Sequence, residues 1–445
     1  MKTETFQNVI IGFGKGGKTL AKMLAMRGET VAVIEESAQM YGGTCINVGC
    51  IPSKSLIVNG EKHMPFKDAV AVKTTLVEKL RSKNYHMIAD EHSATVIDGR
   101  ARFLSDKEIE VTTPGQATRL ITGGRIFINT GATPVVPPIA GLKESKHVVT
   151  SKEIMELAFL PEHLVIIGGG YVGLEFASMF HEYGSQVTII EGSNTFLPRE
   201  DEDVALRIQQ DMVNSGIRFE FGAAVNKVTD TGRKVEISIT DKQGERAITA
   251  DKILVATGRR PNVENLGLEN AGIELTERGA VKVNAQLKTN VGNIWAMGDV
   301  RGGLQFTYIS LDDFRIIESQ LFGDGSYTLN DQNVVPFSVF ITPTLSNVGL
   351  TEREAQKRGI EYKLFKLETA SVPKAQIFGD ARGFFKAMID PVTNQILGAS
   401  IYARESHEVI NLIALAMRAK LPYTMLRNQI YTHPTISEAL NDLFK

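Results

Sequence analysis

Residues 8–35 read NVIIGFGKGGKTLAKMLAMRGETVAVIE, and residues 164–191 read LVIIGGGYVGLEFASMFHEYGSQVTIIE. Each stretch contains an apolar run, the glycine pattern G-x-G-x-x-G, a helical segment, a second apolar run and a terminal glutamate. The first glycine precedes that glutamate by 23 positions in both stretches. A strand–helix–strand unit with these glycines and an acidic residue about 20 positions on is typical of a dinucleotide-binding fold. The sequence therefore predicts two such folds in one chain.

Each glycine of the first fingerprint has its own expected role. Gly12 permits the tight turn after the strand, Gly14 lets the backbone approach a pyrophosphate, and Gly17 lets the helix pack close to the sheet. The pyrophosphate is expected at the helix N-terminus, where free N–H groups and the dipole favour anions, and Glu35 is expected to accept the ribose hydroxyls. The second fingerprint repeats the pattern with Gly168, Gly170, Gly173 and Glu191.

Two dinucleotide sites suggest two cofactors, one held and one exchanging. A flavin and a nicotinamide are the economical pair, because flavins accept hydride and pass on electrons. The Glu191 carboxylate suits a free ribose 2′-hydroxyl and repels a 2′-phosphate, which favours NADH. Arg199 lies eight residues further on and softens that preference, so NADPH stays open.

The only two cysteines, Cys45 and Cys50, lie in GGTCINVGCIPSK at residues 42–54. Pro52 favours a helix start near it, which would place Cys50 at a helix N-terminus and favour its thiolate. A Cys45–Cys50 disulfide needs a distorted turn, which Gly49 would supply. Two buried thiols, or half of a zinc site, are the alternatives, although no neighbouring His or Cys completes a zinc site. Lys54 is either a positive charge near the flavin or a surface lysine.

The composition restricts the class of protein. The chain has 445 residues, of which 43% are hydrophobic and 22% charged, with a net charge of −2. These values are those of a globular protein of about three domains and exclude a disordered chain or a disulfide scaffold. No apolar run approaches the roughly 20 residues of a membrane helix, and no signal peptide is recognised. We therefore expect a cytoplasmic protein that binds neither membrane nor nucleic acid.

The rest of the chain alternates helical and extended patterns. Residues 52–92 are predicted to be largely helical, and residues 94–131 alternate short strands with turns. A helix is expected over 203–215, strands over 218–257 and again over 281–300, and an apolar helix near 405–419. The tail contains His433 and, five residues later, Glu438, whose carboxylate would orient the imidazole as an acid/base.

Together these motifs resemble the flavoprotein disulfide reductases of the glutathione reductase, lipoamide dehydrogenase and mercuric reductase family. GGTCINVGCIPSK is similar to the redox motif of that family, and ATGRRPN at 256–262 is similar to its turn after the nicotinamide domain. AMGD at 296–299 is similar to its second flavin motif, and HPTISE at 433–438 is similar to its interface motif. The resemblance spans nearly the whole chain. It implies an α/β protein with two Rossmann-like domains and a C-terminal α+β dimerisation domain. The implied segments are 1–150 for FAD, 151–258 for NAD(P), 259–332 for the central part and 333–445 for dimerisation.

The resemblance also implies roles for individual residues. Cys50 would be the thiol next to the flavin and Cys45 the thiol that meets the substrate, the two forming a redox-active disulfide. Lys54 and Glu175 would form an ion pair beside the flavin ring, and His433 with Glu438 would reach the site of the partner subunit in a homodimer. The other implied FAD-binding residues are Gly43, Thr44, Thr130, Gly131 and Asp299, and the other implied NAD(P)-binding residue is Gly258; no metal ligand is implied.

Several stretches are similar to a narrower group, the reactive-chlorine-resistance reductases. That group is associated with reducing hypothiocyanous acid with NAD(P)H, and with copper(II) reduction. The resemblance therefore implies hypothiocyanous acid as the substrate. The alternative substrates are a metal ion, Cu(II) or Hg(II), and a disulfide such as that of glutathione or lipoamide. A further alternative is that the protein is a non-catalytic flavin-binding sensor. The chain ends in LNDLFK, without the terminal cysteine pair of mercuric reductases, and position 431 is Tyr where lipoamide dehydrogenases usually have His.

Overall fold

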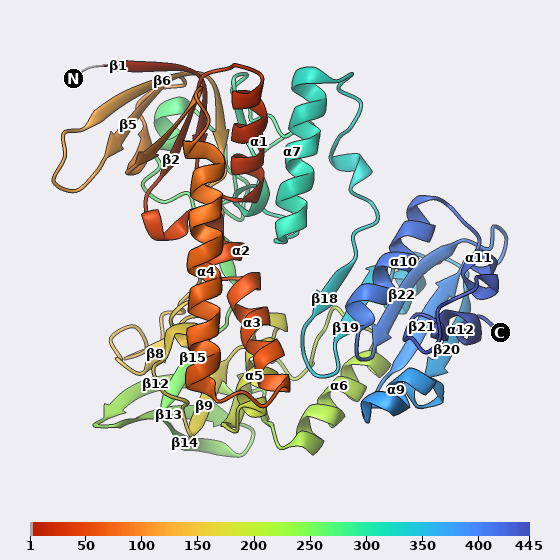
Figure 1. Cartoon of the computed structure of the whole chain (residues 1–445). Helices are drawn as coiled ribbons and strands as arrows, with labels where there is room; N and C mark the ends of the chain where they lie inside the picture. The colour runs from red at the N-terminus through yellow and green to blue at the C-terminus, as the bar shows by residue number, and fades with distance from the viewer. Residues whose placement is uncertain (1–2) are drawn as a thin grey trace. The chain divides into compact units, whose positions relative to one another are not determined.

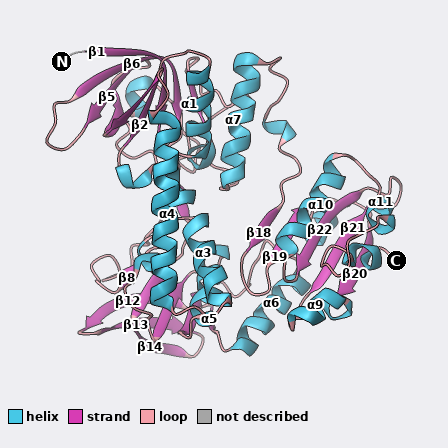
Figure 2. Ribbon diagram, in the orientation of Figure 1, coloured by secondary structure: helices cyan, strands magenta, loops and turns pink. Residues whose placement is uncertain are grey.

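The computed structural model describes residues 3–445, which form two compact units. Unit 1 runs through Val135 and adds Ser151–Ala158 and Gly258–Asp331, whereas unit 2 comprises Val136–Thr150, Phe159–Thr257 and Gln332–Lys445. Each unit is thus assembled from segments that are far apart in the sequence. The fold class predicted from the sequence is confirmed, since helices and strands alternate through both fingerprints and a separate antiparallel sheet follows near the C-terminus (Figures 1 and 2).

A seven-stranded sheet forms the centre of unit 1, in the order β3-β2-β1-β6-β5-β4, with β17 also paired to β6. The pairs of β1 with β2 and β6, of β2 with β3, and of β17 with β6 are parallel, whereas β4, β5 and β6 pair antiparallel. Buried aliphatic side chains cover the faces of this sheet. The strands are β1 (Thr3–Ile11), β2 (Val31–Glu35), β3 (Ala94–Asp98), β4 (Arg100–Phe103), β5 (Glu108–Thr112), β6 (Arg119–Ile128) and β17 (Ile294–Ala296), beside the small pair β7 (Ala132–Pro134) and β16 (Arg259–Pro261).

The helices of unit 1 lie around this sheet, with α1 and α7 side by side in Figure 1. The helix α1 is amphipathic, and its small residues let it approach the sheet closely. The predicted helical region after the cysteines divides into two long helices. The helices are α1 (Lys15–Met26), α2 (Gly43–Asn47), α3 (Cys50–Glu61), α4 (Phe66–Ala89) and α7 (Thr307–Phe322), with 3₁₀ turns at η1 (Ala38–Met40), η2 (Glu153–Glu156), η3 (Leu268–Ala271) and η4 (Gly298–Arg301) and at η5 (Leu329–Asp331).

Unit 2 contains a parallel five-stranded sheet in the order β11-β10-β9-β15-β8. Its strands β9 and β10 flank α5, which gives the second strand–helix–strand unit. An antiparallel sheet of β12, β13 and β14 packs beside it through a shared cluster of buried side chains. The elements are β8 (Val148–Val149), β9 (His163–Ile167), α5 (Tyr171–Glu182), β10 (Gln186–Glu191), α6 (Glu202–Ser215), β11 (Arg218–Phe221), β12 (Ala224–Thr231), β13 (Lys234–Asp241), β14 (Gly244–Ala250) and β15 (Lys252–Val255).

The C-terminal part of unit 2 is a second five-stranded sheet, entirely antiparallel, in the order β18-β19-β22-β21-β20. The amphipathic helix α10 packs on β19 and β22, as the burial of its apolar side predicts. The elements are β18 (Phe337–Val339), β19 (Leu345–Gly349), α8 (Glu352–Lys357), β20 (Lys363–Glu368), η6 (Thr369–Ser371), α9 (Pro373–Phe378), β21 (Phe384–Ile389), β22 (Ile396–Tyr402), α10 (Ser406–Arg418), α11 (Tyr423–Asn428) and α12 (Ala439–Leu443).

One predicted strand is much shorter than expected. Within residues 281–300, only Ile294–Ala296 forms a strand. The preceding residues instead form a turn, in which the Asn284 side chain accepts the N–H groups of Gln286 and Lys288 and Leu287 has φ +64°. This local hydrogen bonding competes with a sheet ladder.

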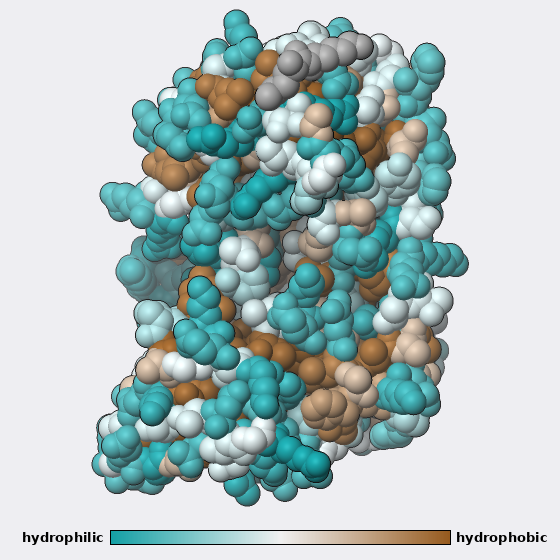
Figure 3. Space-filling model, turned by 90° about the vertical axis from the view of Figure 1, so that its left-hand side faces the viewer, coloured by the Kyte–Doolittle hydropathy of each residue, from teal (hydrophilic) through white to brown (hydrophobic). Residues whose placement is uncertain are grey.

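The face of the molecule drawn in Figure 3 is mostly hydrophilic, as expected for a globular protein with 22% charged residues. On this face, apolar residues gather in smaller patches between the hydrophilic ones. In the described part of the chain, no helix combines the length and the apolar character that crossing a membrane requires.

Candidate active site

The first glycine loop joins β1 to α1 and is closed by the end of β6. Gly12 has φ +101°, and a Cβ there would lie 2.4 Å from the Asn129 carbonyl oxygen, so only glycine fits. At Gly14 a Cβ would lie 2.5 Å from the Asn129 Oδ1 atom, which itself accepts the Gly17 N–H at 3.0 Å. Gly14 is the N-cap of α1 and provides no side-chain cap, so the helix N-terminus is suited to an anion.

The glutamate that ends each fingerprint binds back to its own glycine loop in the same way. The Glu35 Oε2 atom accepts the Phe13 N–H at 2.9 Å, and the Glu191 Oε2 atom accepts the Gly169 N–H at 2.8 Å. Phe13 and Gly169 both stand between the first two glycines of the pattern. Burial raises the pKa of the Glu35 carboxyl, while its backbone hydrogen bonds act in the opposite direction. The predicted repeat therefore extends to hydrogen-bond geometry.

The second glycine loop is more open. Gly168 has φ +107° and packs on the Ala256 carbonyl, as Gly12 does on Asn129. A Cβ at Gly173 would lie 2.1 Å from the Gly168 carbonyl oxygen, which explains the third glycine. At the exposed Gly170, by contrast, a Cβ would meet no atom within 4 Å. The surface around Gly170 therefore leaves room for a ligand.

Asn129 was not singled out by the motif spacing, yet it connects three segments of unit 1. Its Oδ1 atom accepts from Gly17, and its Nδ2 atom donates to the Met297 carbonyl at 3.0 Å. The next residue, Thr130, donates its hydroxyl to the Asn262 carbonyl at 2.7 Å, and the Gly131 carbonyl accepts the Asn262 N–H at 2.9 Å. The loop after β6 thus holds both Thr130 and Gly131 next to the first glycine loop. The only signal for Asn129 is its place at the end of a buried strand.

Asp299 lies in η4, which begins two residues after the end of β17, and is partly buried. Burial raises the pKa of its carboxyl, while the positive charges of Arg259 and Arg301 lower it. Arg301 is held by Asp313 through two hydrogen bonds of 2.7 and 2.8 Å, and Asp313 also accepts the Gly298 N–H at 2.7 Å. The fully buried Asp313 on α7 therefore fixes the turn that carries Asp299, a role that no local motif indicated.

The cysteines lie on two successive helices. Cys45 is in α2, and Cys50 is the first residue of α3, after the N-cap Gly49, as Pro52 predicted. A Cβ at Gly49 would lie 2.9 Å from the Thr44 carbonyl oxygen, so the tight connection between the helices requires glycine. Both cysteines are free thiols, Cys45 partly buried and Cys50 exposed.

The side chains of the two cysteines are hydrogen-bonded to each other. A hydrogen bond to Cys50 and burial raise the pKa of the Cys45 thiol, whereas Thr307 and Lys18 lower it. Thr307, the first residue of α7, also lies 3.7 Å from the Cys50 Sγ atom through its hydroxyl. A Cβ at Gly43 would lie 2.7 Å from the Gly14 Cα atom, so α2 begins against the first glycine loop. The redox pair is thereby placed next to the expected pyrophosphate site, with Thr44 at the start of α2.

The tail pair has the predicted geometry. The His433 Nδ1 atom lies 2.7 Å from the Glu438 Oε2 atom, and the other carboxylate oxygen accepts the Thr435 N–H at 3.3 Å. The His433 side chain is 69% exposed. The contact with Glu438 fixes the orientation of an imidazole that solvent can reach.

The predicted pair of Lys54 and Glu175 stays a prediction. Lys54 lies on α3 of unit 1, one turn after Cys50, and Glu175 lies on α5 of unit 2. The Glu175 carboxylate accepts the Phe340 N–H at 2.8 Å, which anchors it to β18–β19. Gly258 has φ +110° and its carbonyl accepts the Val135 N–H at 3.0 Å.

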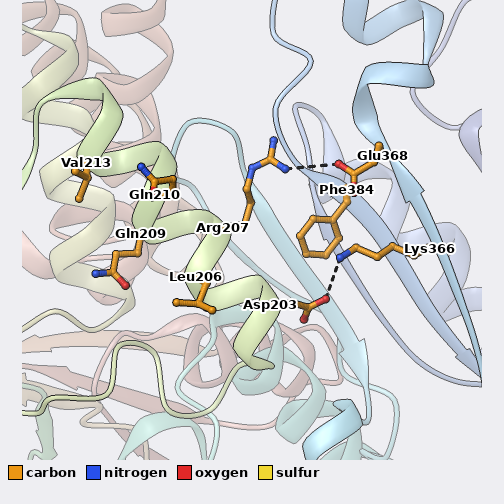
Figure 4. A pocket seen from close by; sticks show the side chains of 9 residues that line it. All are labelled: Asp203, Leu206, Arg207, Gln209, Gln210, Val213, Lys366, Glu368 and Phe384. Atoms are coloured by element: carbon orange, nitrogen blue, oxygen red, sulfur yellow. Dashed lines mark hydrogen bonds and ion pairs between the residues drawn. The ribbon is translucent and has the colours of Figure 1, made fainter.

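Unit 2 also has a cavity of about 630 Å³ between α6 and the edge strand β20. Figure 4 shows that its charged side chains point toward one another: Arg207 pairs with Glu368, and Lys366 with Asp203. Among residues 3–445, the one group of three or more side chains with metal-ligand geometry is Asp201, Asp203 and Glu352, nearby. The Lys386 ammonium lies 2.9 Å from Asp201 and 2.8 Å from Asp203 and also pairs with Glu352, so the cation among these carboxylates is a lysine of the chain itself.

Comparison with known proteins identifies the family. The model of the pyridine nucleotide-disulphide oxidoreductases matches residues 6–313, and the model of their dimerisation domain matches residues 335–444. The chain belongs to the pyridine nucleotide-disulphide oxidoreductase family. The resemblance on which the sequence analysis relied is thereby confirmed. FAD and NAD(P)H are the cofactors of this family, and the chain is a flavoprotein oxidoreductase with a dimerisation domain.

Full-length relatives narrow the position within the family. The chain is 47% identical over 439 residues to the probable pyridine nucleotide-disulfide oxidoreductase RclA of Escherichia coli, covering 99% of this chain and 98% of the relative. It is 33% identical to a dihydrolipoyl dehydrogenase of Corynebacterium glutamicum, over 99% of this chain and 97% of that protein. A Staphylococcus aureus mercuric reductase is 32% identical over 97% of this chain and 80% of its own length.

The similar solved structures point to the same relative as the sequence comparison. The Cu(II) complex of the HOCl-induced flavoprotein disulfide reductase RclA from Escherichia coli matches with a TM-score of 0.96 and 47% identity, over 99% of both chains. The structure of the same Escherichia coli protein described without copper matches with a TM-score of 0.95. This chain is therefore a flavoprotein disulfide reductase closely related to RclA.

Proposed function

We propose that this chain uses NAD(P)H, FAD and the Cys45–Cys50 pair to reduce hypothiocyanous acid to thiocyanate in defence against oxidants. The observation that supports it best is the adjacent pair of thiols, with Cys50 at a helix N-terminus and Thr307 beside it, in a chain 47% identical to an HOCl-induced reductase. A substrate with four non-hydrogen atoms needs no wide cleft for a peptide or lipoyl group.

The residues of unit 1 fit a flavin dinucleotide. The Gly12 and Gly14 positions admit no Cβ, α1 has an uncapped N-terminus, and Glu35 lies beside the loop. When bound, the flavin accepts hydride from the nicotinamide and passes two electrons to the cysteine pair. We assign FAD binding to Gly12, Gly14, Gly17, Glu35, Gly43, Thr44, Lys54, Thr130, Gly131 and Asp299, and NAD(P) binding to Gly168, Gly170, Gly173, Glu175, Glu191 and Gly258.

The thiol chemistry proceeds in two displacements. The Cys45 thiolate attacks the sulfur of hypothiocyanous acid; the S–O bond breaks and the leaving hydroxide takes a proton to become water. The Cys50 thiolate then attacks the Cys45 sulfur; the bond to the SCN group breaks, thiocyanate leaves and the disulfide forms. Over the full cycle, NADH and hypothiocyanous acid give NAD⁺, thiocyanate and water. Two thiol exchanges thereby replace one direct reduction.

We further propose that His433, oriented by Glu438, manages the protons of both displacements in the partner subunit of a homodimer. The exposed imidazole and the match of residues 335–444 to the dimerisation domain support this. The assignment of segments 1–150, 151–258, 259–332 and 333–445 to FAD, NAD(P), central and dimerisation roles is part of the same proposal. A cytoplasmic location is proposed because the enzyme consumes a nicotinamide from the cytoplasmic pool.

Stopped-flow reoxidation of the NADH-reduced enzyme tests the substrate. We expect fast, saturable reoxidation by stoichiometric hypothiocyanous acid and slow reaction with oxidised glutathione or lipoamide. Cys45→Ser should lose this reaction while it retains FAD, and Cys50→Ser should complete only the first displacement and accumulate a Cys45–SCN adduct visible by mass spectrometry. Fast reaction with a disulfide and slow reaction with hypothiocyanous acid would refute the assignment.

Cu(II) is the second candidate substrate, because the similar RclA structure is described as a Cu(II) complex. Within residues 3–445, the one group of three or more His, Cys, Asp or Glu with metal-ligand geometry contains neither cysteine, so no third such ligand accompanies the two thiols within one subunit. The same stopped-flow experiment with Cu(II) separates the candidates. Turnover of Cu(II) that survives Cys45→Ser would indicate direct reduction without the cysteine pair.

A further inference from the structure

Lys18 is a buried cation with an unusual set of neighbours. It lies in α1, one turn after Gly14, and is 5% exposed. Its ammonium donates to the Asn84 Oδ1 atom on α4, a neutral partner. Among residues 3–445, Lys18 forms no salt bridge with a carboxylate. Because a buried ammonium is costly without a countercharge, a functional reason for its place is expected.

The structure places this ammonium beside the redox pair. Asn84 packs against the start of α2, since a Cβ at Gly42 would lie 3.3 Å from the Asn84 Cγ atom. Gly42 precedes Cys45 by three residues. The charges of Lys18 and Cys45 interact: burial and Lys15 lower the pKa of the Lys18 ammonium to about 8, and the Cys45 thiolate opposes this. Of the groups that act on the Lys18 ammonium, Cys45 is therefore the one that favours its charged form.

Different neighbouring groups interact with each of the two cysteines. Cys45 faces Cys50 on α3, Thr307 on α7 and Lys18 on α1. Cys50 interacts electrostatically with Arg259 and with Tyr308. Arg259 also interacts with the Asp299 carboxylate. A cation therefore stands near each sulfur: Arg259 for Cys50 and Lys18 for Cys45.

We propose that Lys18 is a positioning residue whose buried ammonium favours the thiolate form of Cys45 and so prepares this sulfur, rather than Cys50 alone, for attack on a small oxidant. The inference rests on the proposed function of Cys45 as the attacking thiol. Asn84 holds the ammonium in place by its hydrogen bond, and the Gly14–Gly43 contact holds α1 against α2. The thiolate is the reactive form of cysteine, so the charge acts on the rate of the first displacement.

The test measures the ionisation of Cys45 directly. In the flavin-loaded Cys50→Ser enzyme, Cys45 is the only cysteine, and its rate of alkylation by iodoacetamide across a pH series gives its apparent pKa. Lys18→Met should raise this pKa by about one unit, which slows alkylation at neutral pH about tenfold. Lys18→Gln, which keeps a donor for Asn84 but lacks the charge, should give the same shift, and Lys18→Arg should largely reverse it.

Lys22→Met is the matched control, because Lys22 lies one turn further along α1 and pairs with Glu91. It should leave the alkylation profile unchanged. The proposal is overturned if Lys18→Met and Lys18→Gln leave the profile unchanged, if Lys22→Met moves it equally, or if both Lys18 variants lose flavin while Lys22→Met retains it. Because alkylation needs no hypothiocyanous acid, failure of the inference is distinct from failure of the proposed substrate, which the stopped-flow experiment reports.

Discussion

Replacing Lys386 by Met tests the reasoning about the second unit most directly. Lys386 comes from β21, and its ammonium joins Glu352 of α8 to Asp201 and Asp203 at the start of α6. The side chain of Lys386 is 3% exposed. The variant therefore leaves three neighbouring carboxylates without their shared cation. These contacts connect the part of unit 2 that carries the second fingerprint to its five-stranded antiparallel sheet, so the expected effect is on the stability of that unit.

The structure supplies the size of the effect. Removing one partner of a buried ion pair costs about 3–5 kcal/mol. The lower end applies here because the Asp203 side chain is 40% exposed and that of Glu352 is 21% exposed. In the variant, the Asp201 carboxylate still accepts hydrogen bonds from the backbone N–H groups of Glu352 and Arg353, each at 3.1 Å. A loss of about 3 kcal/mol lowers the melting temperature of a unit of this size by about 6–12 °C.

The dependence on pH gives the prediction a second part. Burial opposes ionisation of Asp203, but its hydrogen bonds to Lys386 and Lys366 outweigh burial and lower its pKa. A carboxyl with a lowered pKa in the folded state contributes stability above its unfolded pKa of about 3.9 and loses it as the pH falls through the folded value. The difference in melting temperature between wild type and Lys386→Met should therefore narrow as the pH falls from about 7 to below 4.

Calorimetry of the flavin-loaded enzyme at both pH values is the assay. Lys366→Met is the matched control: Lys366 also contacts Asp203, at 3.1 Å, but its side chain is 39% exposed. It should cost about 1 kcal/mol or less. The reasoning is refuted if Lys386→Met melts within about 2 °C of wild type at neutral pH, or if the two lysine variants are equally unstable.

Three further predictions concern the cofactor and proton sites. Gly43→Ala should lower the flavin content of the purified protein, because Gly43 has φ +76° and an added Cβ would lie 2.7 Å from the Gly14 Cα atom of the first glycine loop. The control Gly115→Ala should keep its flavin, because Gly115 has a similar φ of +74° but no atom within 4 Å of an added Cβ. Equal flavin loss in both variants would contradict the close-contact argument. Glu191→Gln should lower the ratio of kcat/KM for NADH over NADPH about fivefold, since two charges about 4 Å apart in water interact by about 1 kcal/mol; an unchanged ratio would exclude this residue as the discriminator. Glu438→Gln should slow steady-state turnover about tenfold or more by loosening His433, and wild-type turnover would remove the pair from the proton pathway.

The sequence predicted local geometry well because glycine patterns and apolar runs act within one strand–helix–strand unit. The turn at Gly12, the start of α3 at Cys50 and the contact of His433 with Glu438 all depend on residues close in the chain. Asn129 could not be predicted in the same way, since it binds Gly17 across 112 positions. Its role depends on the parallel register of β1 with β6, which no motif encodes.

The same limit explains Asp313 and Lys386. Both are buried charges whose partners come from other segments, so the sequence shows only an ordinary aspartate in a helix and an ordinary lysine in a strand. Lys18 differs, because it lies directly after the last glycine of the first fingerprint, at a buried position of the helix. A charge on the buried side of an amphipathic helix is a signal that sequence reasoning is able to use.

The two fingerprints also show how one motif serves two kinds of binding. Both glutamates hold their own loop by the same hydrogen bond, yet Glu35 is buried and Glu191 is partly exposed. The second glycine of the first loop is enclosed by Asn129, whereas the corresponding Gly170 has open space around it. A loop packed tightly against neighbouring segments suits a dinucleotide that stays bound, and a loop with open space around it suits one that exchanges. The difference therefore supports a flavin held at the first loop and a nicotinamide exchanging at the second, and it arises from the residues around the glycines rather than from the glycines themselves.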